Sequence, residues 1–136
     1  MTKLKKNYKP TNKEKFMNAK MKEYFKQKLM NWKKELLEGS SVTIEKLKNE
    51  QNSAQPDITD RATEEIERSF ELRTRDRERK LINKIDSALL RIENGSYGYC
   101  EETGEQISLK RLEARPVATM SLEAQEMHEK AEKRLN

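Results

Sequence analysis

Four positions near the end of the chain have the spacing of a zinc site. Cys100, Thr103, Ser121 and Ala124 follow the pattern C-x2-T-x17-S-x2-A. Cysteine at all four positions would strongly predict zinc, because four thiolates close a tetrahedron around the ion. Here only Cys100 has a thiol; two positions have neutral hydroxyls and Ala124 has no donor atom. We therefore interpret the four positions as degenerate and expect no metal cofactor.

Sets of residues typical of enzymes are missing from the sequence. There is no Ser/His/Asp set, no glycine-rich phosphate loop and no HExxH motif. The only histidine, His128, falls in a polar segment and is interpreted as a surface residue. Glu101 and Glu102 disfavour a thiolate at Cys100, so a buried, unreactive thiol is favoured over a redox sensor. We expect no enzymatic activity.

Two carboxylates follow the turn-forming segment QNSAQP. Asp57 and Asp60 lie three residues apart at the start of a predicted helix, where both can cap orphan backbone amides. Capping leaves both side chains projecting from the end of that helix. From there they could meet a cationic residue or influence a bound Mg²⁺, whose preferred ligands are oxygens.

A cluster of cations occupies the middle of the same predicted helix. Arg73, Arg77 and Lys80 lie on successive turns of one face. The simplest interpretation is a solvated surface with ion pairs between residues four apart. The alternative is that the cations bind an acidic rim on a partner, because an arginine fork pairs well with carboxylates.

Hydrophobic periodicity predicts two long helices, at about 16–50 and 57–94. The first stripe has steps of four, four, three and four residues, and consists of Met21, Phe25, Leu29, Trp32 and Leu36. The second stripe is expected to consist of Ala62, Ile66, Leu81, Ile82, Ile85, Leu89 and Ile92. Because the connection is short, the helices must be antiparallel and bury their stripes against each other. The prediction is a coiled-coil hairpin over 16–95 with its tip near 51–60.

The remainder, 96–136, is expected to be a small globule resembling a zinc finger, followed by a helix. Without zinc it needs an apolar mini-core, for which the candidates are Tyr97, Tyr99, Ile107, Leu109, Leu112, Val117 and Met120. A small hairpin around Ile107 and Val117 is a further expectation. Ser121 is the predicted N-cap of the final helix. The fold class is therefore all-α.

Composition limits the classes of protein to which the chain can belong. Charged residues make up 39% of the 136 residues, which suits long solvated helices rather than a large core. One cysteine allows no intrachain disulfide, as expected in the cytoplasm. No apolar run could span a membrane or serve as a signal peptide. Residues 1–50 contain 14 lysines and six glutamates, and 1–15 are expected to be a basic flexible tail.

Three stretches resemble the DksA/TraR family of bacterial RNA polymerase-binding factors. They are DITDRA at 57–62, LRTRDRERKLI at 72–82 with YGYC at 97–100, and KRLEARPVAT at 110–119. With one cysteine at the four finger positions, the chain resembles the zinc-independent branch of that family. The resemblance implies a monomer whose hairpin enters the polymerase secondary channel. It places Asp57, Asp60 and Ala62 near the active site, and Arg73, Arg77 and Lys80 at the channel rim.

The resemblance also implies control of ribosomal RNA and amino-acid promoters in the stringent response. The alarmone ppGpp is expected at the polymerase interface, near Leu81, Lys84 and Arg115. Gln125 stands where related proteins have a further lysine, which leaves the affinity for ppGpp open. Thr74 replaces a common asparagine, so a local contact differs.

Two other functions are compatible with the residues. One is a lysine-rich helical hairpin that binds nucleic acid, with a steep salt dependence set by the first fifty residues. The absence of interleaved aromatic residues argues against this function. The other is a transcript-cleavage factor of similar shape, which would release short 3′ RNA fragments. The family resemblance favours a polymerase-binding factor without sequence-specific binding to DNA.

Overall fold

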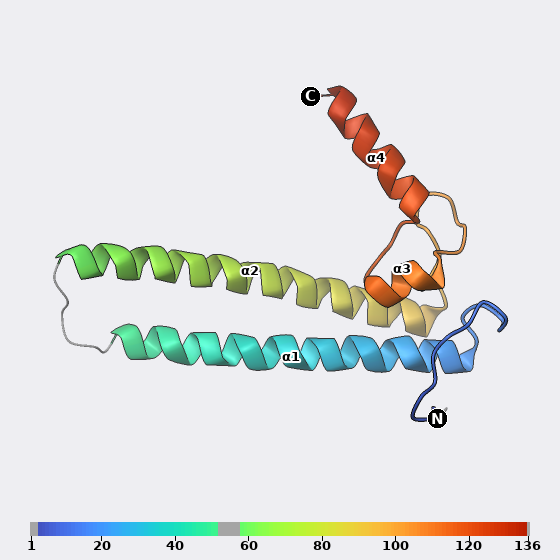
Figure 1. The fold of residues 1–136 in the computed structure, drawn as a ribbon, viewed down its shortest axis with the longest axis horizontal. Coiled ribbons are helices and arrows are strands. Elements are labelled where there is room, and N and C mark those ends of the chain that lie inside the picture. Colours follow the sequence, from blue (N-terminus) through green and yellow to red (C-terminus); the bar gives the residue numbers. More distant parts are fainter. Residues whose placement is uncertain (1–2, 52–57, 136) are drawn as a thin grey trace. The chain divides into compact units, whose positions relative to one another are not determined.

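Four helices make up the regular structure of the computed structural model, which describes residues 3–51 and 58–135, without the side chains of 40–51 and 58–60. In chain order they are α1 (Ala19–Gln51), α2 (Ile58–Asn94), α3 (Leu109–Ala114) and α4 (Leu122–Leu135) (Figure 1). Across these ranges there is no β-strand, only an isolated bridge between Tyr99 and Gln106. The all-α prediction is confirmed. The small hairpin expected around Ile107 and Val117 is wrong, because α3 lies between these residues.

Local sequence explains where the helices begin and end. The Asn18 side chain accepts a hydrogen bond from the Met21 amide at 2.9 Å and so caps α1. Gly95, with φ +86°, ends α2, and the Ser96 and Tyr97 amides donate back to the Arg91 carbonyl at 3.0 and 3.1 Å. Ser121 caps α4 as predicted, its hydroxyl accepting from the Ala124 amide at 3.2 Å. None of the helices in the described ranges is long and apolar enough to cross a membrane.

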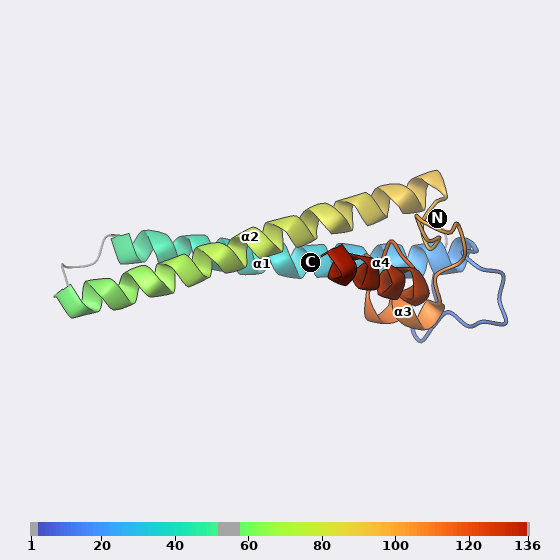
Figure 2. The same cartoon turned by 90° about the horizontal axis from the view of Figure 1, so that it is seen from above.

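The chain forms two compact units, 1–30 with 85–136, and 31–84. In the first unit, the start of α1 and the end of α2 lie side by side in opposite directions (Figures 1 and 2). Their shared core contains fully buried side chains from both helices, namely Met21, Phe25, Leu29, Ile85 and Ala88. Both predicted stripes are confirmed in this unit. The predicted division into 1–15, 16–95 and 96–136 stays a prediction.

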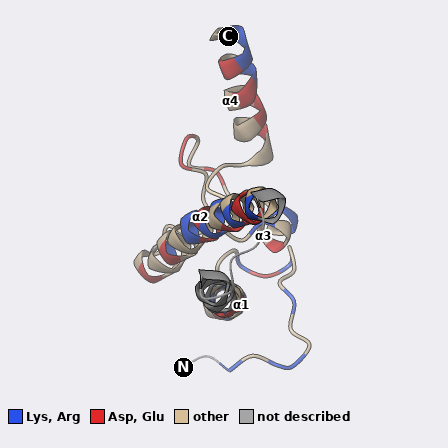
Figure 3. Ribbon diagram, turned by 90° about the vertical axis from the view of Figure 1, so that its left-hand side faces the viewer, with Lys and Arg blue, Asp and Glu red and all other residues tan. Residues whose placement is uncertain are grey.

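The second unit pairs 31–51 of α1 with 58–84 of α2, again in opposite directions (Figures 1 and 2). Lysines and arginines alternate with acidic residues along this part of α2 (Figure 3). Between Arg61 and Lys80 only five residues are half-buried, at steps of four and three: Glu64, Arg68, Glu71, Arg75 and Glu78. Here the least exposed stripe of α2 is therefore charged. Long side chains of this kind can cover apolar surface with their methylene groups while their charged ends stay hydrated.

The predicted start of the α2 stripe is therefore wrong. Ala62 is exposed and Ile66 is 69% exposed, although both were expected to face α1. The register of α2 explains the difference. Within the second unit, the least exposed side of α2 runs through Glu64, Arg68 and Glu71, and Ile66 lies on another side of the helix. The inward side of α2 in this unit is therefore the charged stripe.

Candidate functional site

The degenerate zinc positions keep a compact turn. Cys100 is 3% exposed, its amide donates to the Glu105 carbonyl at 2.7 Å, and its carbonyl accepts from the Gly104 amide at 2.9 Å. Gly104 has φ +74°, a conformation that glycine adopts without strain. The Ile107 amide closes the loop by donating to the Gly98 carbonyl at 2.7 Å. Backbone hydrogen bonds therefore hold the turn around Cys100.

The hydroxyl of Thr103 caps a turn, and the hydroxyl of Ser121 caps a helix. Thr103 Oγ1 accepts from the Glu105 amide at 3.3 Å. Ser121 Oγ accepts from the Ala124 amide, and both residues are buried, at 7% and 3% exposed. The methyl group of Ala124 offers no ligand. Across the described residues, no group of three or more His, Cys, Asp or Glu could hold a metal ion. The donor set around Cys100 does not fit a structural zinc ion.

The Cys100 thiol has an unusual environment. Burial alone would raise its pKa, but hydrogen bonds from the Thr103 hydroxyl and from the Ser121, Thr103 and Glu102 amides lower the pKa to about 7. The sequence interpretation had the sign wrong, because it considered the carboxylates of Glu101 and Glu102 and not the surrounding amides. Burial was anticipated correctly. The thiolate is favoured inside a turn that gives solvent little access to the sulfur.

An apolar core fills the globule. Tyr97, Ile107, Leu112 and Val117 are buried as predicted, and the Tyr97 hydroxyl donates to the Pro116 carbonyl at 2.7 Å. Of the other predicted core residues, Leu109 and Met120 are half-buried and Tyr99 is 38% exposed. The globule therefore has a genuine core, although a small one.

The N-terminal segment, 8–17, packs against this core. Met17 is 7% exposed, and the ring of Phe16 meets that of Tyr99 edge-on at 5.4 Å between centroids. A Cβ atom at Gly98 would lie 3.0 Å from both Met17 Cε and Phe16 Cζ. We call this segment the N-terminal strap. The prediction that 1–15 is a flexible tail stays a prediction.

A polar cluster fixes the other end of the strap. The rings of Tyr8 and Tyr24 meet at 6.0 Å, and the Tyr8 hydroxyl donates to Glu14 at 3.1 Å. The Tyr24 hydroxyl donates to Glu113 on α3, and Lys28 Nζ lies 3.4 Å from the same carboxylate. Burial, and secondarily Glu113, raises the pKa of Tyr24 to about 12. The cluster links α1 to α3 beneath the strap.

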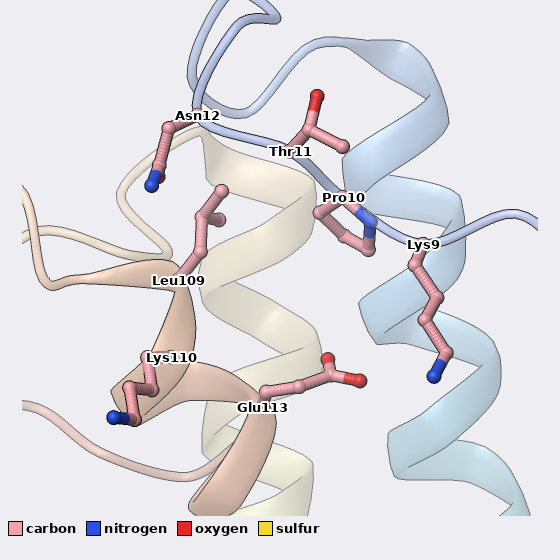
Figure 4. Close-up of a pocket in the computed structure, with 7 residues that line it drawn as sticks. All are labelled: Lys9, Pro10, Thr11, Asn12, Leu109, Lys110 and Glu113. Carbon is pink, nitrogen blue, oxygen red and sulfur yellow. The ribbon is translucent and has the colours of Figure 1, made fainter.

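Sequence reasoning missed the strap because it considered only the lysines of 1–15 and began a helix at about 16. Tyr8, Phe16 and Met17 are large apolar residues in the otherwise polar stretch 1–20, and that was the available signal. A cavity of about 420 Å³ lies between the strap and α3 (Figure 4). Residues 9–12 form one wall, and Leu109, Lys110 and Glu113 form the other.

The predicted tip lies largely outside the described residues. Asp57 is not described, and only the backbone of Asp60, in the first turn of α2, is described. Ala62 is exposed. Their proposed action therefore stays a prediction.

The three predicted rim cations are all exposed on α2. Arg73 Nε donates to its own helix, at the Ser69 carbonyl, over 3.3 Å. Arg77 and Lys80 form no ion pair with any residue in the described ranges. The simplest interpretation, a surface held by ion pairs four residues apart, therefore receives no support at these cations.

The predicted ppGpp residues are distributed over both units. Leu81 is half-buried and Lys84 is exposed, one turn apart on α2 in the second unit. Arg115, in the first unit, follows α3, where its amide donates to the Arg111 carbonyl at 2.7 Å and its side chain is exposed. Gln125 bonds to Glu129 on α4 at 3.1 Å. An alarmone site formed by these residues stays a prediction.

His128 is exposed on α4, as the sequence indicated. Its Nδ1 atom lies 3.5 Å from Glu132, and its Nε2 atom lies 4.0 Å from Glu102. These contacts form only a weak surface cluster.

Comparison with known proteins identifies the family. The family model of the DnaK suppressor protein DksA, N-terminal domain, matches residues 21–92, and that of the prokaryotic dksA/traR C4-type zinc finger matches 95–130. The chain belongs to the DksA/TraR family. The resemblance found in the sequence is thereby confirmed, including a match to the zinc-finger model despite the missing cysteines.

Named members of the DksA/TraR family are similar along most of the chain. The RNA polymerase-binding transcription factor DksA of Caulobacter vibrioides NA1000 is 60% identical over 95% of this chain and 90% of that protein. The factor of the same name from Escherichia coli K12 is 39% identical over 90% of this chain and 80% of its own length. The structure of the transcription factor DksA2 from Pseudomonas aeruginosa aligns with a TM-score of 0.81 and 37% identity. That alignment covers 87% of this chain and 90% of DksA2.

Proposed function

We propose that this protein binds bacterial RNA polymerase and modulates transcription initiation. The observation that carries the proposal is the 60% identity, over nearly the whole chain, to a factor named for polymerase binding. The protein acts by contact and not by catalysis. It is expected in the cytoplasm as a monomer, without sequence-specific contacts to DNA.

The proposed mechanism divides the work among three regions. The helical hairpin enters the secondary channel, where Asp57, Asp60 and Ala62 act near the polymerase active site. Exposed Arg73, Arg77 and Lys80 bind the channel rim. Their cations have no ion-pair partner among the described residues, which supports this role. The alarmone ppGpp binds at the polymerase interface with Leu81, Lys84 and Arg115, and strengthens the effect in the stringent response.

The globule is proposed to work without zinc. Of the four positions with the spacing of a zinc site, only Cys100 has a thiol. The hydroxyls of Thr103 and Ser121 already accept backbone hydrogen bonds. Metal analysis of the purified protein tests this. Less than about a tenth of an equivalent of zinc is expected, whereas near-stoichiometric zinc would refute the proposal.

Competition on purified core polymerase tests the proposed binding. A known secondary-channel factor should displace this protein, and Asp57→Asn with Asp60→Asn should keep binding but abolish the effect on initiation. Wild-type protein that fails to bind at moderate salt would overturn the proposed function. Release of short 3′ RNA fragments from stalled complexes would instead indicate a cleavage factor.

A further inference from the structure

One face of α2 in the second unit is exposed at every position. It consists of Ala62, Ile66, Phe70, Arg73, Arg77 and Lys80, at steps of four, four, three, four and three residues. We call these six residues the outer face. Residues with these steps share one side of a helix, because 3.6 residues make one turn. The outer face is therefore a continuous strip, apolar toward the start of α2 and basic further along.

No carboxylate lies on this strip, although α2 is rich in them. Residues 62–80 contain six acidic side chains, at 64, 65, 67, 71, 76 and 78, and none is at an outer-face position. Arg77 shows the consequence. Its neighbours three and four residues away are Arg73, Thr74, Lys80 and Leu81, so no acidic residue is placed to pair with it along the helix. Asp76 lies three residues from Arg73 and four from Lys80, but neither cation forms an ion pair among the described residues. The three cations are therefore available to a partner.

The apolar part of the strip is unusually exposed. Ile66 is 69% exposed and Phe70, one turn along, is 67% exposed. Meanwhile the half-buried stripe of the same stretch is occupied by charged residues. Two large apolar side chains on adjacent turns, bordered by arginine, have the composition of an interface anchor, since aromatic residues and arginine dominate binding energy at interfaces.

We propose that the outer face docks on an acidic protein surface containing an apolar cleft. Ile66 and Phe70 enter the cleft, while Arg73, Arg77 and Lys80 pair with carboxylates along its border. This inference rests on the proposed function, and the acidic surface belongs to RNA polymerase. It adds Ile66 and Phe70, which no sequence argument assigned to binding, and adds an apolar cleft to the acidic rim that the sequence suggested.

Charge and shape favour this partner over two others. Nucleic acid would pair its phosphates with the cations but would leave the Ile66–Phe70 pair exposed to water. A second copy packed in parallel through the same strip would bring two basic parts together, and like charges repel. An acidic protein surface with an apolar cleft pairs with the cations and also buries Ile66 and Phe70.

Matched substitutions test the outer face. Phe70→Gln is compared with Leu72→Gln, and Arg77→Gln with Arg79→Gln. Each control residue is exposed, lies two residues further along α2 and therefore projects from the opposite side. The measurement is the affinity of each full-length variant for core RNA polymerase at several salt concentrations, with circular dichroism to verify helix content.

Phe70→Gln and Ile66→Gln should each weaken binding roughly tenfold or more, as expected for an anchor residue. Arg77→Gln should weaken binding and reduce its salt dependence, while both controls stay within about twofold of wild type. If wild type binds and the Phe70 and Leu72 variants bind equally, the inference fails but the proposed function stands. If wild type does not bind polymerase, the proposed function itself fails.

Two further outcomes would also overturn the inference. Wild type could sediment as a dimer that Ile66→Gln dissociates, which would make the strip a contact between copies. It could also bind duplex DNA in a manner lost in Arg77→Gln but retained in Phe70→Gln, which would make the strip a nucleic-acid surface. Monomeric wild type without such DNA binding is the expected result.

Discussion

The ring of Phe16 packs edge-on against the ring of Tyr99, with centroids 5.4 Å apart and planes inclined by 80°. This contact joins the N-terminal strap to the turn that contains Cys100. It places apolar packing next to a turn that keeps only one of four zinc-ligand positions. In a four-cysteine finger the metal ion contributes to folding, and here the strap is placed to contribute packing energy instead.

Shortening a buried side chain of the strap should destabilise the globule. Met17→Ala removes a buried side chain, so the free energy of unfolding should fall by about 2 kcal/mol or more. Chemical denaturation measures the loss. Met127→Ala serves as control because Met127 is 71% exposed, and it should change stability little. Equal effects of the two substitutions would show that the strap does not pack as described.

Gly98 should be less tolerant of a side chain than Gly104. Both have positive φ, +90° and +74°, so alanine strains the backbone at either position by roughly 1 kcal/mol. Only at Gly98 would the new methyl group meet Phe16 and Met17, at 3.0 Å, whereas nothing lies within 4 Å at Gly104. Thermal denaturation should show a lower melting temperature for Gly98→Ala than for Gly104→Ala. A reversed order would contradict the close contact between the strap and the turn.

The Cys100 thiol should ionise near neutral pH. Its pKa of about 7 lies below the ordinary 9.0 because hydrogen bonds from Thr103 and nearby amides outweigh burial. Because folding lowers the pKa of Cys100, its ionisation stabilises the fold fully at pH values above the ordinary pKa of 9.0. This contribution to stability is lost as pH falls through about 7. Thiolate absorbance at 240 nm, with Cys100→Ser subtracted, measures the titration.

Thr103 provides the matched test of that environment. Thr103→Val should move the thiolate titration upward, because it removes the hydroxyl that donates to the sulfur, whereas Thr103→Ser should keep the titration near 7. An unchanged midpoint in Thr103→Val would assign the shift to the backbone amides alone.

Alkaline conditions should weaken the contact between α1 and α3. Burial and Glu113 raise the pKa of Tyr24 to about 12 from an ordinary 10.0. The folded state therefore holds the proton of the Tyr24 hydroxyl more tightly than the unfolded state does. The contribution of Tyr24 to stability is full below pH 10 and is lost between about pH 10 and 12. The free energy of unfolding should fall over that range, and less steeply in Tyr24→Phe. Similar slopes in both proteins would exclude Tyr24 as the titrating group.

Local sequence signals were sufficient for several features of this protein. Periodicity predicted both long helices within a few residues of their ends, and Ser121 marked the start of α4. Three ordered stretches, at 57–62, 72–82 with 97–100, and 110–119, identified the family, because ordered motifs survive the loss of individual ligands. These features depend on residues close together along the chain, where backbone geometry fixes the relationship.

Only the tertiary structure decided which surfaces are buried. Apolarity alone assigned Ile66 to the inward stripe, but in the structure the inward stripe of the second unit is charged and Ile66 is 69% exposed. The strap contacts at Phe16 and Met17 join residues about eighty positions apart, and the amides around Cys100 come from three separate residues. Such contacts depend on how distant segments pack, and packing energy is shared among elements that no local pattern connects.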